Sequence, residues 1–479
     1  MKSPLLFSIL FISVFAFLFG TSCKKTPAAA TTVPTITTTD VILDVTSTTA
    51  QSGGTITNVG SASITANGVC YSTTNQTPTT ANSKTTDPII SASYTYESNL
   101  SGLTPSTTYY VRAYASNTYG TGYGSVVKFT TSSNLASVTG TVTTLAGSAG
   151  SGNGNGTGAG ASFNNPQGVA VDAQGNVYVA DSFNNLIREI TPAGVVTTIA
   201  GNGTAGYLDG PAASAEFYGP QGLAVDAQGN VFVADYGNNV IREITPAGVV
   251  STFAGNTTAG YVDGAATVAE FNSPAGLAFD KQGNLIVADH NNNMIRKITP
   301  AGVVSLIAGT LTEGYINATI NSPTGAYASF HNPSGVAVDA SGNIYVADLA
   351  NSAIRKITPG LVVTTIGGGP TQSAVLGFPA GITIDATGNL FVTDESGRIL
   401  ELTSAGVLYT LAGASNVTGF TDGVGSAVQF NVPQGICVDL QGNVYIADTN
   451  NNSIRKLVVT DVQVTAASKK PIISRSAKK

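Results

Sequence analysis

One sequence block recurs six times between residues 166 and 457, and it constrains the fold more than any other feature. The first copy reads Pro166-Gln-Gly-Val-Ala-Val-Asp172-Ala-Gln-Gly-Asn176-Val-Tyr-Val-Ala-Asp181. Two aspartates nine positions apart mark the copies, at 172/181, 226/235, 280/289, 339/348, 385/394 and 439/448, with steps of 54, 54, 59, 46 and 54 residues. Repeats of this period are typical of propellers, solenoids and arrays.

Each copy contains four short β-prone segments separated by tight turns. In the first copy they are Gly168–Val171, Val177–Ala180, Leu186–Ile190 and Val195–Ala200. Asp-Ala-Gln-Gly-Asn and Thr-Pro-Ala-Gly are turn sequences with glycine where φ is positive. Four antiparallel strands with no room for a crossover helix indicate a propeller blade, whose faces are buried by neighbouring blades. The sequence therefore predicts an all-β fold with a six-bladed β-propeller over residues 137–464.

The two ends of the repeat region complement each other. The last copy ends without the Val-Val-Thr-Thr-Ile-Ala-Gly segment that closes the other copies, and a similar segment precedes the first copy at Val142–Gly147. We expect this N-terminal strand to complete the final blade and remove a free sheet edge. A permuted seventh blade is the alternative.

The repeats resemble the NHL repeat family of six-bladed propellers. The resemblance rests on Pro-x-Gly, the two aspartates with Gly-Asn between them, and the following Ile-Arg-[Glu/Lys]-Ile. The Ala-Gly-Tyr-x-Asp-Gly loops are similar to those of the teneurin-type NHL repeats. Asn-Leu, Asn-Val or Asn-Met stands here where the Asn-His-Leu that names the family is expected.

Residues 34–131 precede the repeats and have the pattern of a small β-sandwich. They are rich in Thr, Ser, Val and Tyr, with turn signals every 8–12 residues and alternation in Tyr109–Ala115. About a hundred residues with this spacing favour a seven-stranded sandwich. The stretch Leu100–Ala113 resembles the corner between two strands of fibronectin type III domains, where a tyrosine hydroxyl bonds back to the chain. The resemblance implies a structural role for this module.

The chain begins with a segment typical of export. Residues 1–22 comprise Lys2, an apolar run from Leu5 to Phe19 and small residues before Cys23, which indicates a signal peptide. Gly-Thr-Ser-Cys resembles a bacterial lipobox, which implies lipidation of Cys23; secretion in soluble form and an uncleaved anchor are the alternatives. Residues 23–33 are expected to be a tether and 465–479 a basic tail. We therefore expect a lipid-anchored bacterial envelope protein, at the outer membrane.

Charge restricts the partners of the repeat region. Residues 137–464 hold 10 Lys and Arg against 23 Asp and Glu, and this acidic balance excludes nucleic acid as an expected partner. Blade connectivity places varied long loops on one face, which favours a protein or glycan partner. Contact with a membrane is expected through the lipid anchor alone. The candidate binding residues are Tyr207, Asp209, Tyr236, Tyr261, Asp263, Tyr315, Phe420 and Asp422. Alternatively, the Tyr-x-Asp-Gly loops fold the link between blades back onto the blade edge.

Five of the second aspartates are followed seven residues later by an arginine. Antiparallel pairing brings the two ends of a hairpin together, so a structural ion pair is expected in each. The pairs are Asp181 with Arg188, Asp235 with Arg242, Asp289 with Arg296, Asp348 with Arg355, and Asp448 with Arg455. A ring of arginines that binds an anion is the alternative. The fifth copy departs from this pattern with Leu400 and a shifted Arg398.

The sequence contains few groups suited to catalysis. Two histidines, His290 and His331, are weak candidates for a metal site, and no catalytic residue, metal site or cofactor is predicted. The channel-mouth positions of lactonase-type propellers correspond to Gln167, Gln221, Ala275, Ser334, Ala380 and Gln434, none of them a carboxylate. We expect a non-catalytic binding scaffold. A metal-dependent lactonase- or lyase-like enzyme is the alternative.

Overall fold

The computed structural model describes residues 31–39, 42–43, 45–89, 95–131, 135–318, 327–370 and 376–463. The predicted signal peptide, Cys23 and the basic tail lie outside these residues. Within them the fold is all-β, and one pair of named strands is parallel while the rest are antiparallel. No helix among the described residues is long and apolar enough to cross a membrane.

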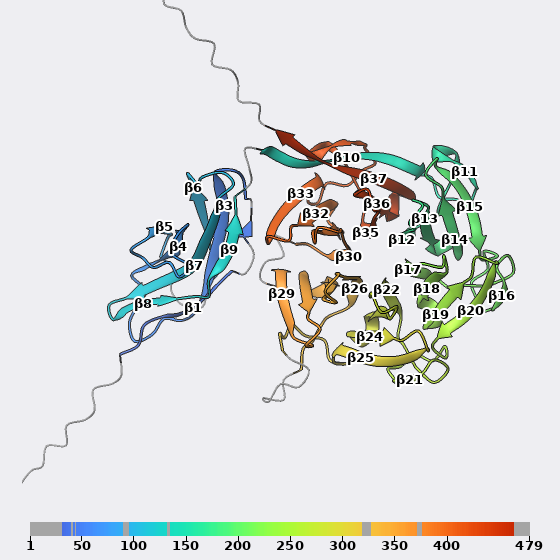
Figure 1. Ribbon diagram of the computed structural model, residues 1–479, viewed down its shortest axis with the longest axis horizontal. Helices are drawn as coiled ribbons and strands as arrows, with labels where there is room; N and C mark the ends of the chain where they lie inside the picture. The colour runs from blue at the N-terminus through green and yellow to red at the C-terminus, as the bar shows by residue number, and fades with distance from the viewer. Residues whose placement is uncertain are drawn as a thin grey trace, which may run out of the picture.

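Six groups of four hydrogen-bonded strands form a ring in the C-terminal part of the chain, and five of these groups belong to sheets that contain further strands (Figure 1). We call the six groups blades one to six, and in the first five the strands run in chain order from the centre outwards. Blades one to three comprise β12 (Pro166–Val171), β13 (Val177–Asp181), β14 (Leu186–Ile190), β15 (Val195–Ala200); β17 (Pro220–Val225), β18 (Val231–Asp235), β19 (Val240–Ile244), β20 (Val249–Ala254); β22 (Pro274–Phe279), β23 (Leu285–Asp289), β24 (Met294–Ile298) and β25 (Val303–Gly309). Blades four to six comprise β26 (Pro333–Val338), β27 (Ile344–Asp348), β28 (Ala353–Ile357), β29 (Val363–Gly368); β30 (Pro379–Ile384), β31 (Leu390–Asp394), β32 (Arg398–Leu402), β33 (Val407–Gly413); β35 (Pro433–Val438), β36 (Asn443–Asp448), β37 (Ser453–Gln463) and β10 (Leu135–Gly147). The predicted propeller-like architecture is therefore present.

The innermost strands approach one another closely around the centre. Each contacts the first strand of the next blade, and the cycle closes from β35 of blade six to β12 of blade one. A side chain on Gly168 would collide with the carbonyl oxygen of Gln221, and one on Gly435 with that of Gln167. The glycine of the repeated Pro-x-Gly is thus required because neighbouring backbones touch at this position.

Apolar cores lie between adjacent blades. Each contains residues of two neighbouring blades, as where Val179 of blade one packs in one core with Ile454 of blade six. A blade therefore buries its faces against its neighbours.

The ring is closed by the strand that comes first in the chain. Strand β10 pairs antiparallel with β37, in a register that includes Val142 opposite Leu457 and Thr144 opposite Arg455. This confirms the expected completion of the last blade by the segment that precedes the first repeat.

Short accessory elements complete the blades. Two-residue strands from the links pair with the outer strands of blades one, two, three and six: β11 (Gly156–Thr157), β16 (Gly210–Pro211), β21 (Gly264–Ala265) and β34 (Gly423–Val424). Five 3₁₀ turns follow second strands: η2 (Ser182–Asn184), η3 (Tyr236–Asn238), η4 (His290–Asn292), η5 (Leu349–Asn351) and η7 (Thr449–Asn451). Two more lie in links, η1 (Gly158–Gly160) and η6 (Gly425–Ala427).

The N-terminal part contains two groups of antiparallel strands beside the ring (Figure 1). One comprises β1 (Thr35–Thr38), β2 (Ile42–Leu43), β3 (Thr49–Asn58) and β6 (Thr95–Ser101). The other comprises β4 (Ala66–Ser72), β5 (Ser83–Lys84), β7 (Thr108–Asn117), β8 (Gly120–Tyr123) and β9 (Val127–Thr130). We call these strands the sandwich. The backbone N–H of Thr104 donates to the Tyr109 hydroxyl at 2.9 Å, which is the kind of bond expected at the tyrosine corner.

The sandwich joins the ring at blade five. Strand β2 pairs in parallel with β33, with Ile42 opposite Val407, so strands of both parts form one continuous sheet. Val407 is also part of the apolar core of the sandwich, and Tyr409 packs against that core. Val407 is 2% exposed, whereas Val249 and Val303, which begin the outer strands of blades two and three, are 48% and 47% exposed.

Candidate functional site

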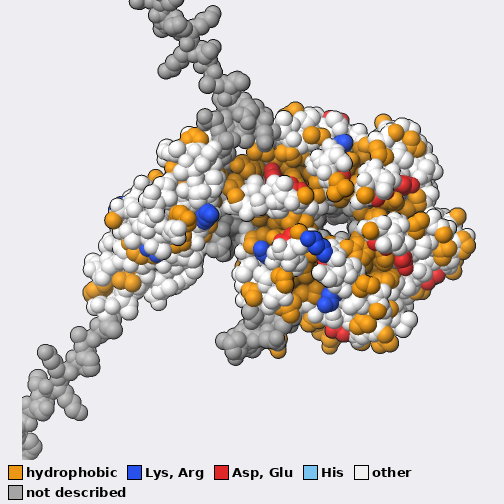
Figure 2. Space-filling model, viewed as in Figure 1, with side chains coloured by type: hydrophobic (Ala, Val, Ile, Leu, Met, Phe, Trp, Pro, Cys, Tyr) orange, Lys and Arg blue, Asp and Glu red, His pale blue; other side chains and the backbone are white. Residues whose placement is uncertain are grey.

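A cavity that is open to solvent lies at the centre of the ring. Figure 2 shows the molecule hollowed there, and the first strands of all six blades line the cavity. We call the side where the links and the turns between second and third strands lie the long-loop face, and the opposite side the short-turn face. Because Pro166 pairs with Asp181, the first strands begin at the long-loop face. The lining residues nearest this face are Gln167, Gln221, Ala275, Ser334, Ala380 and Gln434.

Each second strand ends at the same face as this opening and is followed by one further residue, and we call the opening together with these six residues the channel mouth. The six residues, each directly after the last aspartate of its second strand, are Ser182, Tyr236, His290, Leu349, Glu395 and Thr449. The Ser182 hydroxyl donates to the Pro220 carbonyl, and the Thr449 hydroxyl donates to the Pro166 carbonyl at 2.8 Å. These two side chains therefore connect adjacent blades.

His290 makes the equivalent contact through its ring. Its Nδ1 lies 3.1 Å from the Pro333 carbonyl oxygen, and because a carbonyl accepts, Nδ1 carries the hydrogen. Burial lowers the pKa of His290, and nearby His331 lowers it further, although the bond to Pro333 opposes both. The imidazole is therefore neutral near pH 7, and its Nε2 has a lone pair that can accept a hydrogen bond.

Glu395 brings a carboxylate to the channel mouth that the sequence analysis did not identify. Gln434 Nε2 donates to Glu395 Oε1 at 3.0 Å, which ties the turn of blade five to the cavity lining of blade six. Burial raises the pKa of Glu395 and the charge of Asp394 adds to this, while the Gln434 bond lowers it. In the sequence, Glu395 could have been identified by its position directly after Asp394, the aspartate that ends the second strand of blade five.

The blade-two side of the mouth has polar groups without protein partners. Tyr236, one of the predicted binding residues, lies beside His290 with ring centroids 6.2 Å apart. Among the described residues, neither the Tyr236 hydroxyl nor the Gln221 side chain has a hydrogen-bond partner. Blade two and blade five lie opposite each other in the cycle of first strands, so Tyr236 and Glu395 are on opposite sides of the opening.

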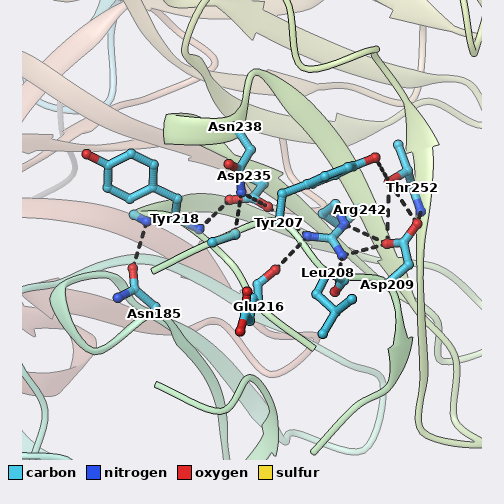
Figure 3. Close-up of polar contacts among 12 residues, drawn as sticks. Asn185, Tyr207, Leu208, Asp209, Glu216, Tyr218, Asp235, Asn238, Arg242 and Thr252 are labelled. Carbon is cyan, nitrogen blue, oxygen red and sulfur yellow. Dashed lines mark hydrogen bonds and ion pairs between the residues drawn. The ribbon is translucent and has the colours of Figure 1, made fainter. Parts of the chain in front are cut away.

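The predicted aspartate–arginine pairs are brought together in blades one, two, three, four and six. In blade two, Arg242 Nη1 lies 2.8 Å from Asp235 Oδ2, and both side chains are fully buried (Figure 3). Asp235 also accepts from the Tyr218 backbone N–H and the Asn238 side chain. The other distances are 2.7 Å for Arg188, 2.8 Å for Arg296, 2.7 Å for Arg355 and 2.5 Å for Arg455. We call each such pair, with the link residues that bond to the arginine, an Arg clamp.

The link before each clamped blade supplies the remaining acceptors. Asp209 Oδ1 lies 2.5 Å from Arg242 Nη2, the Leu208 carbonyl accepts from the same nitrogen, and Tyr207 covers the guanidinium with its ring (Figure 3). Equivalent acceptors elsewhere are Asn155, Asp263, Asn317 and Asp422. The five arginines are therefore buried, and both Nη groups of each bond to acceptors within the blade, which argues against the alternative of an anion-binding ring.

Most of the candidate binding residues also make contacts within the blades, as in the alternative in which the links fold back onto the blade edge. Asp209, Asp263 and Asp422 are ion-paired to clamp arginines, and their side chains are 42–47% exposed. The rings of Tyr207, Tyr315 and Phe420 lie about 5.0 Å from clamp guanidiniums. Tyr261 is exposed on the link before blade three. Seven of the eight residues thus belong to links at the blade rims, and Tyr236 alone of the eight lies at the channel mouth.

The asparagine-rich tips of the long-loop face also have a structural role. Asn185 adopts a left-handed conformation, and its side-chain oxygen accepts from the Gly219 N–H of the next blade at 3.0 Å. The side-chain oxygen of Asn452 likewise accepts from the Asn165 N–H at 2.9 Å, where blade six meets blade one. These tips hold neighbouring blades together.

Blade five has no Arg clamp. Leu400 occupies the position of the clamp arginine and is buried. Asp394 pairs instead with Arg398 on the next strand and accepts from the Ser396 N–H. Burial raises the pKa of Asp394, but the Arg398 charge and the backbone donors outweigh it and hold the pKa below its usual value.

The two histidines, His290 and His331, bond to different groups. His331 Nε2 lies 3.0 Å from Glu313 Oε2, while His290 bonds to Pro333. No group of three or more His, Cys, Asp and Glu side chains suited to a metal ion occurs within the part of the chain that the structure describes. Cys70 and Cys437 are buried and free.

Comparison with known proteins identifies the repeats. The NHL repeat model matches residues 217–242, 271–298, 330–357 and 430–457, and the Teneurin NHL domain model matches residues 126–207. None of these segments includes residues 379–402, the first three strands of blade five.

Similar proteins include human Teneurin-4, 30% identical over 224 residues, and the chloroplastic Protein SUPPRESSOR OF QUENCHING 1 of Arabidopsis thaliana, 41% identical over 81 residues. These alignments cover 41% and 17% of this chain, respectively, but each spans 8% of the relative. A crystal structure of a protein of unknown function from Bacteroides thetaiotaomicron is similar over 90% of this chain and 98% of its own, with 20% identity and a TM-score of 0.52. That likeness supports the fold. The chain therefore carries NHL repeats, with a segment similar to the teneurin NHL domain, on an all-β, propeller-like fold.

Proposed function

We propose that this protein is a bacterial cell-envelope lipoprotein whose six-bladed propeller binds a protein or glycan partner without catalysis. Cys23 carries the lipid, residues 23–33 form the tether, and a fibronectin type III-like sandwich at 34–131 connects it to the propeller at 137–464. The anchor holds the protein at the outer membrane. The export-type N-terminal segment and the order of the modules support this arrangement.

The channel mouth on the long-loop face is the binding site in this proposal. The carrying observation is the central cavity, whose rim has polar groups at Tyr236 and Gln221 without partners among the described residues, while buried Arg clamps stabilise five of the six blades. A concave site with a few polar groups on a rigid scaffold is a typical ligand site. The rims of the blades, where most of the link aromatics lie, contribute less because those side chains are used within the blades.

One observation favours an enzyme as the second candidate. Burial raises the pKa of Glu395 at the channel mouth, and a carboxyl with a raised pKa is a candidate for general acid or base chemistry. The lactonase- or lyase-like alternative would use this carboxyl with the neutral His290. A metal-dependent form fits poorly, because the described residues offer no cluster of three suitable ligands.

Affinity capture from envelope extract tests the binding proposal. The wild-type chain should retain a defined partner that Tyr236→Ala and Gln221→Ala lose, while the rim variant Tyr261→Ala retains it. Equal retention by all three variants would remove the channel mouth as the site. A lactone and glycan turnover screen separates the candidates, because activity that disappears in Glu395→Gln would establish the enzyme.

A further inference from the structure

We propose that the channel mouth accommodates one neutral, hydroxyl-rich ring, such as a pyranose residue of a saccharide. This inference rests on the proposed function for the location of the site and goes beyond it in the class of ligand. It is argued from the polar groups that the mouth offers, from the charges that it lacks, and from its shape.

The blade-two side offers both hydrogen-bond directions within a short stretch of chain. The Gln221 amide has an N–H₂ donor and a carbonyl acceptor, and the Tyr236 hydroxyl is a donor and an acceptor. Neither side chain bonds to another described residue, although Gln221 lines the cavity. A sugar hydroxyl can also donate and accept a hydrogen bond. It therefore matches these side chains better than a ligand group that can only donate or only accept.

The remaining sides of the mouth add acceptors. His290 uses Nδ1–H for the Pro333 carbonyl, which leaves the lone pair of Nε2 for a donor. Glu395 receives the Gln434 N–H on one oxygen, which leaves its second oxygen for a ligand hydroxyl. Because blades two and five are opposite each other, these groups surround a ligand rather than meeting it from one side.

Charge argues against an anionic ligand. The five clamp arginines of the long-loop face are fully buried against aspartates, and Arg398 pairs with Asp394. Lys281 lies in a short turn, and Lys297, Lys356 and Lys456 lie near the short turns at the ends of third strands. No described cation is therefore free to neutralise a phosphate or carboxylate at the mouth, while Glu395 would repel one.

The shape of the mouth suits a small ring. The cavity is open to solvent, and a glycine of each first strand lines it without a side chain that would fill it. Ala275 and Ala380 add only small side chains to the wall, and the Tyr236 ring provides apolar area with a polar tip. A pyranose has this same combination of an apolar face and a polar edge.

Ligand-observed NMR and calorimetry on the full chain test the proposal. The probes are glucose, galactose, mannose, xylose and their β-1,4 and α-1,4 disaccharides, with glucuronic and galacturonic acids as charged counterparts of the first two. We expect at least one neutral saccharide to bind, and its uronic acid counterpart to bind about 10-fold more weakly or not at all. Tyr236→Phe and Gln221→Ala should each weaken binding about 5- to 10-fold, the loss of roughly one hydrogen bond.

The controls separate this inference from the proposed function. Tyr261→Phe, at the exposed rim, should bind the saccharide as the wild type does, and thermal midpoints verify that each variant is folded. Absence of binding by every neutral probe, equal binding of the uronic acids, or insensitivity to both mouth variants would overturn the saccharide assignment. If a partner is still captured from envelope extract and lost in Tyr236→Ala, the proposed function stands although the saccharide assignment falls.

Discussion

Blade two and blade five solve the same structural problem with different chemistry. Blade two holds its third strand with a buried Arg242 that joins its second strand to the preceding link, and β16 from that link caps its outer edge. Blade five has Leu400 instead of the arginine, and its outer edge is capped by β2 of the sandwich. A polar connection within the blade has been replaced by apolar docking of another module.

The difference explains why one repeat departs from the other five. The step into blade five is 46 residues, against 54 for three of the other steps, and the link before it contains no Tyr-x-Asp-Gly sequence. The outer strand also has Tyr409 where the equivalent strands have Ser or Thr, because this position packs against the sandwich. A repeat whose sequence departs from the others can therefore indicate that another module covers the outer edge of its blade.

The largest effect should come from removing a clamp arginine. Arg242→Leu gives blade two the residue of blade five but leaves Asp235 buried without its partner, so we expect a loss of about 3–5 kcal/mol of unfolding free energy. Chemical denaturation measures it. Leu400→Met in blade five is the matched control, expected to change stability by less than about 1.5 kcal/mol. A loss below about 1 kcal/mol for Arg242→Leu would mean that the clamp is not essential.

The next effect concerns the docked edge. Val407→Asp places a charge in the apolar contact between β33 and the sandwich, and we expect a loss of about 2–4 kcal/mol with faster hydrogen exchange in β2 and β33. Val303→Asp is the same change at the corresponding, exposed position of blade three and should alter stability by less than about 0.5 kcal/mol. Equal effects of the two substitutions would contradict a specific role of the sandwich in blade five.

A smaller effect should separate the clamps from one another. Arg242 Nε donates to Asp209, whereas the Nε of Arg188, next to Asn155, has no partner among the described residues. Asp209→Asn should destabilise by about 1 kcal/mol, and Asn155→Asp should stabilise by up to about 1 kcal/mol, since these acceptors are partly exposed. Thermal midpoints of the two variants should therefore shift in opposite directions, and parallel shifts would contradict the acceptor argument.

The smallest effect concerns how stability depends on pH. His290 and Glu395 occupy equivalent positions in two blades, and their contributions to stability should change with pH in opposite directions. The pKa of His290 is lowered in the folded state, so its contribution to stability is complete above about 6.5, the ordinary value, and is lost as the pH falls through the folded pKa. The pKa of Glu395 is raised, so its contribution is present below 4.5 and is lost as the pH rises through the folded pKa. The unfolding free energy should be measured from pH 4 to 8. Its dependence on pH should become weaker below about pH 6.5 in His290→Gln and above about pH 4.5 in Glu395→Gln. Unchanged curves for both variants would show that neither group titrates differently on folding.

The repeated blades could be predicted from the sequence in detail. Leu186–Ile190 and Val195–Ala200 were predicted with their observed bounds, and Val177–Ala180 differs by one residue from β13. The pairing of Asp181 with Arg188 followed from hairpin geometry. These features depend on residues close together in the chain, where spacing alone determines which side chains meet.

Long-range contacts could not be predicted in the same way. The partner of Arg242 in the preceding link, Asp209, was interpreted as a binding residue because its distance in sequence hides the contact. Glu395 was not predicted, because blade five differs most visibly from the other blades at Leu400, the position of the clamp arginine. The turn after Asp394, which contains Glu395, gave a weaker signal. The docking of β2 had one sequence signal, an aromatic residue at position 409 in an otherwise Ser- or Thr-bearing strand, which has meaning once the partner is known.

The closure of the ring has a consequence for how the chain reaches its folded state. Val142 emerges early in the chain, and its partner Leu457 comes after all the other blades. Contacts between such distant residues form slowly, because closing the long loop between them costs entropy before the contacts contribute any favourable energy. Until β37 arrives, β10 has an unpaired edge of the kind that promotes aggregation. Completion of blade six is therefore the last step that the chain order permits, and any product that ends before residue 453 keeps that edge open.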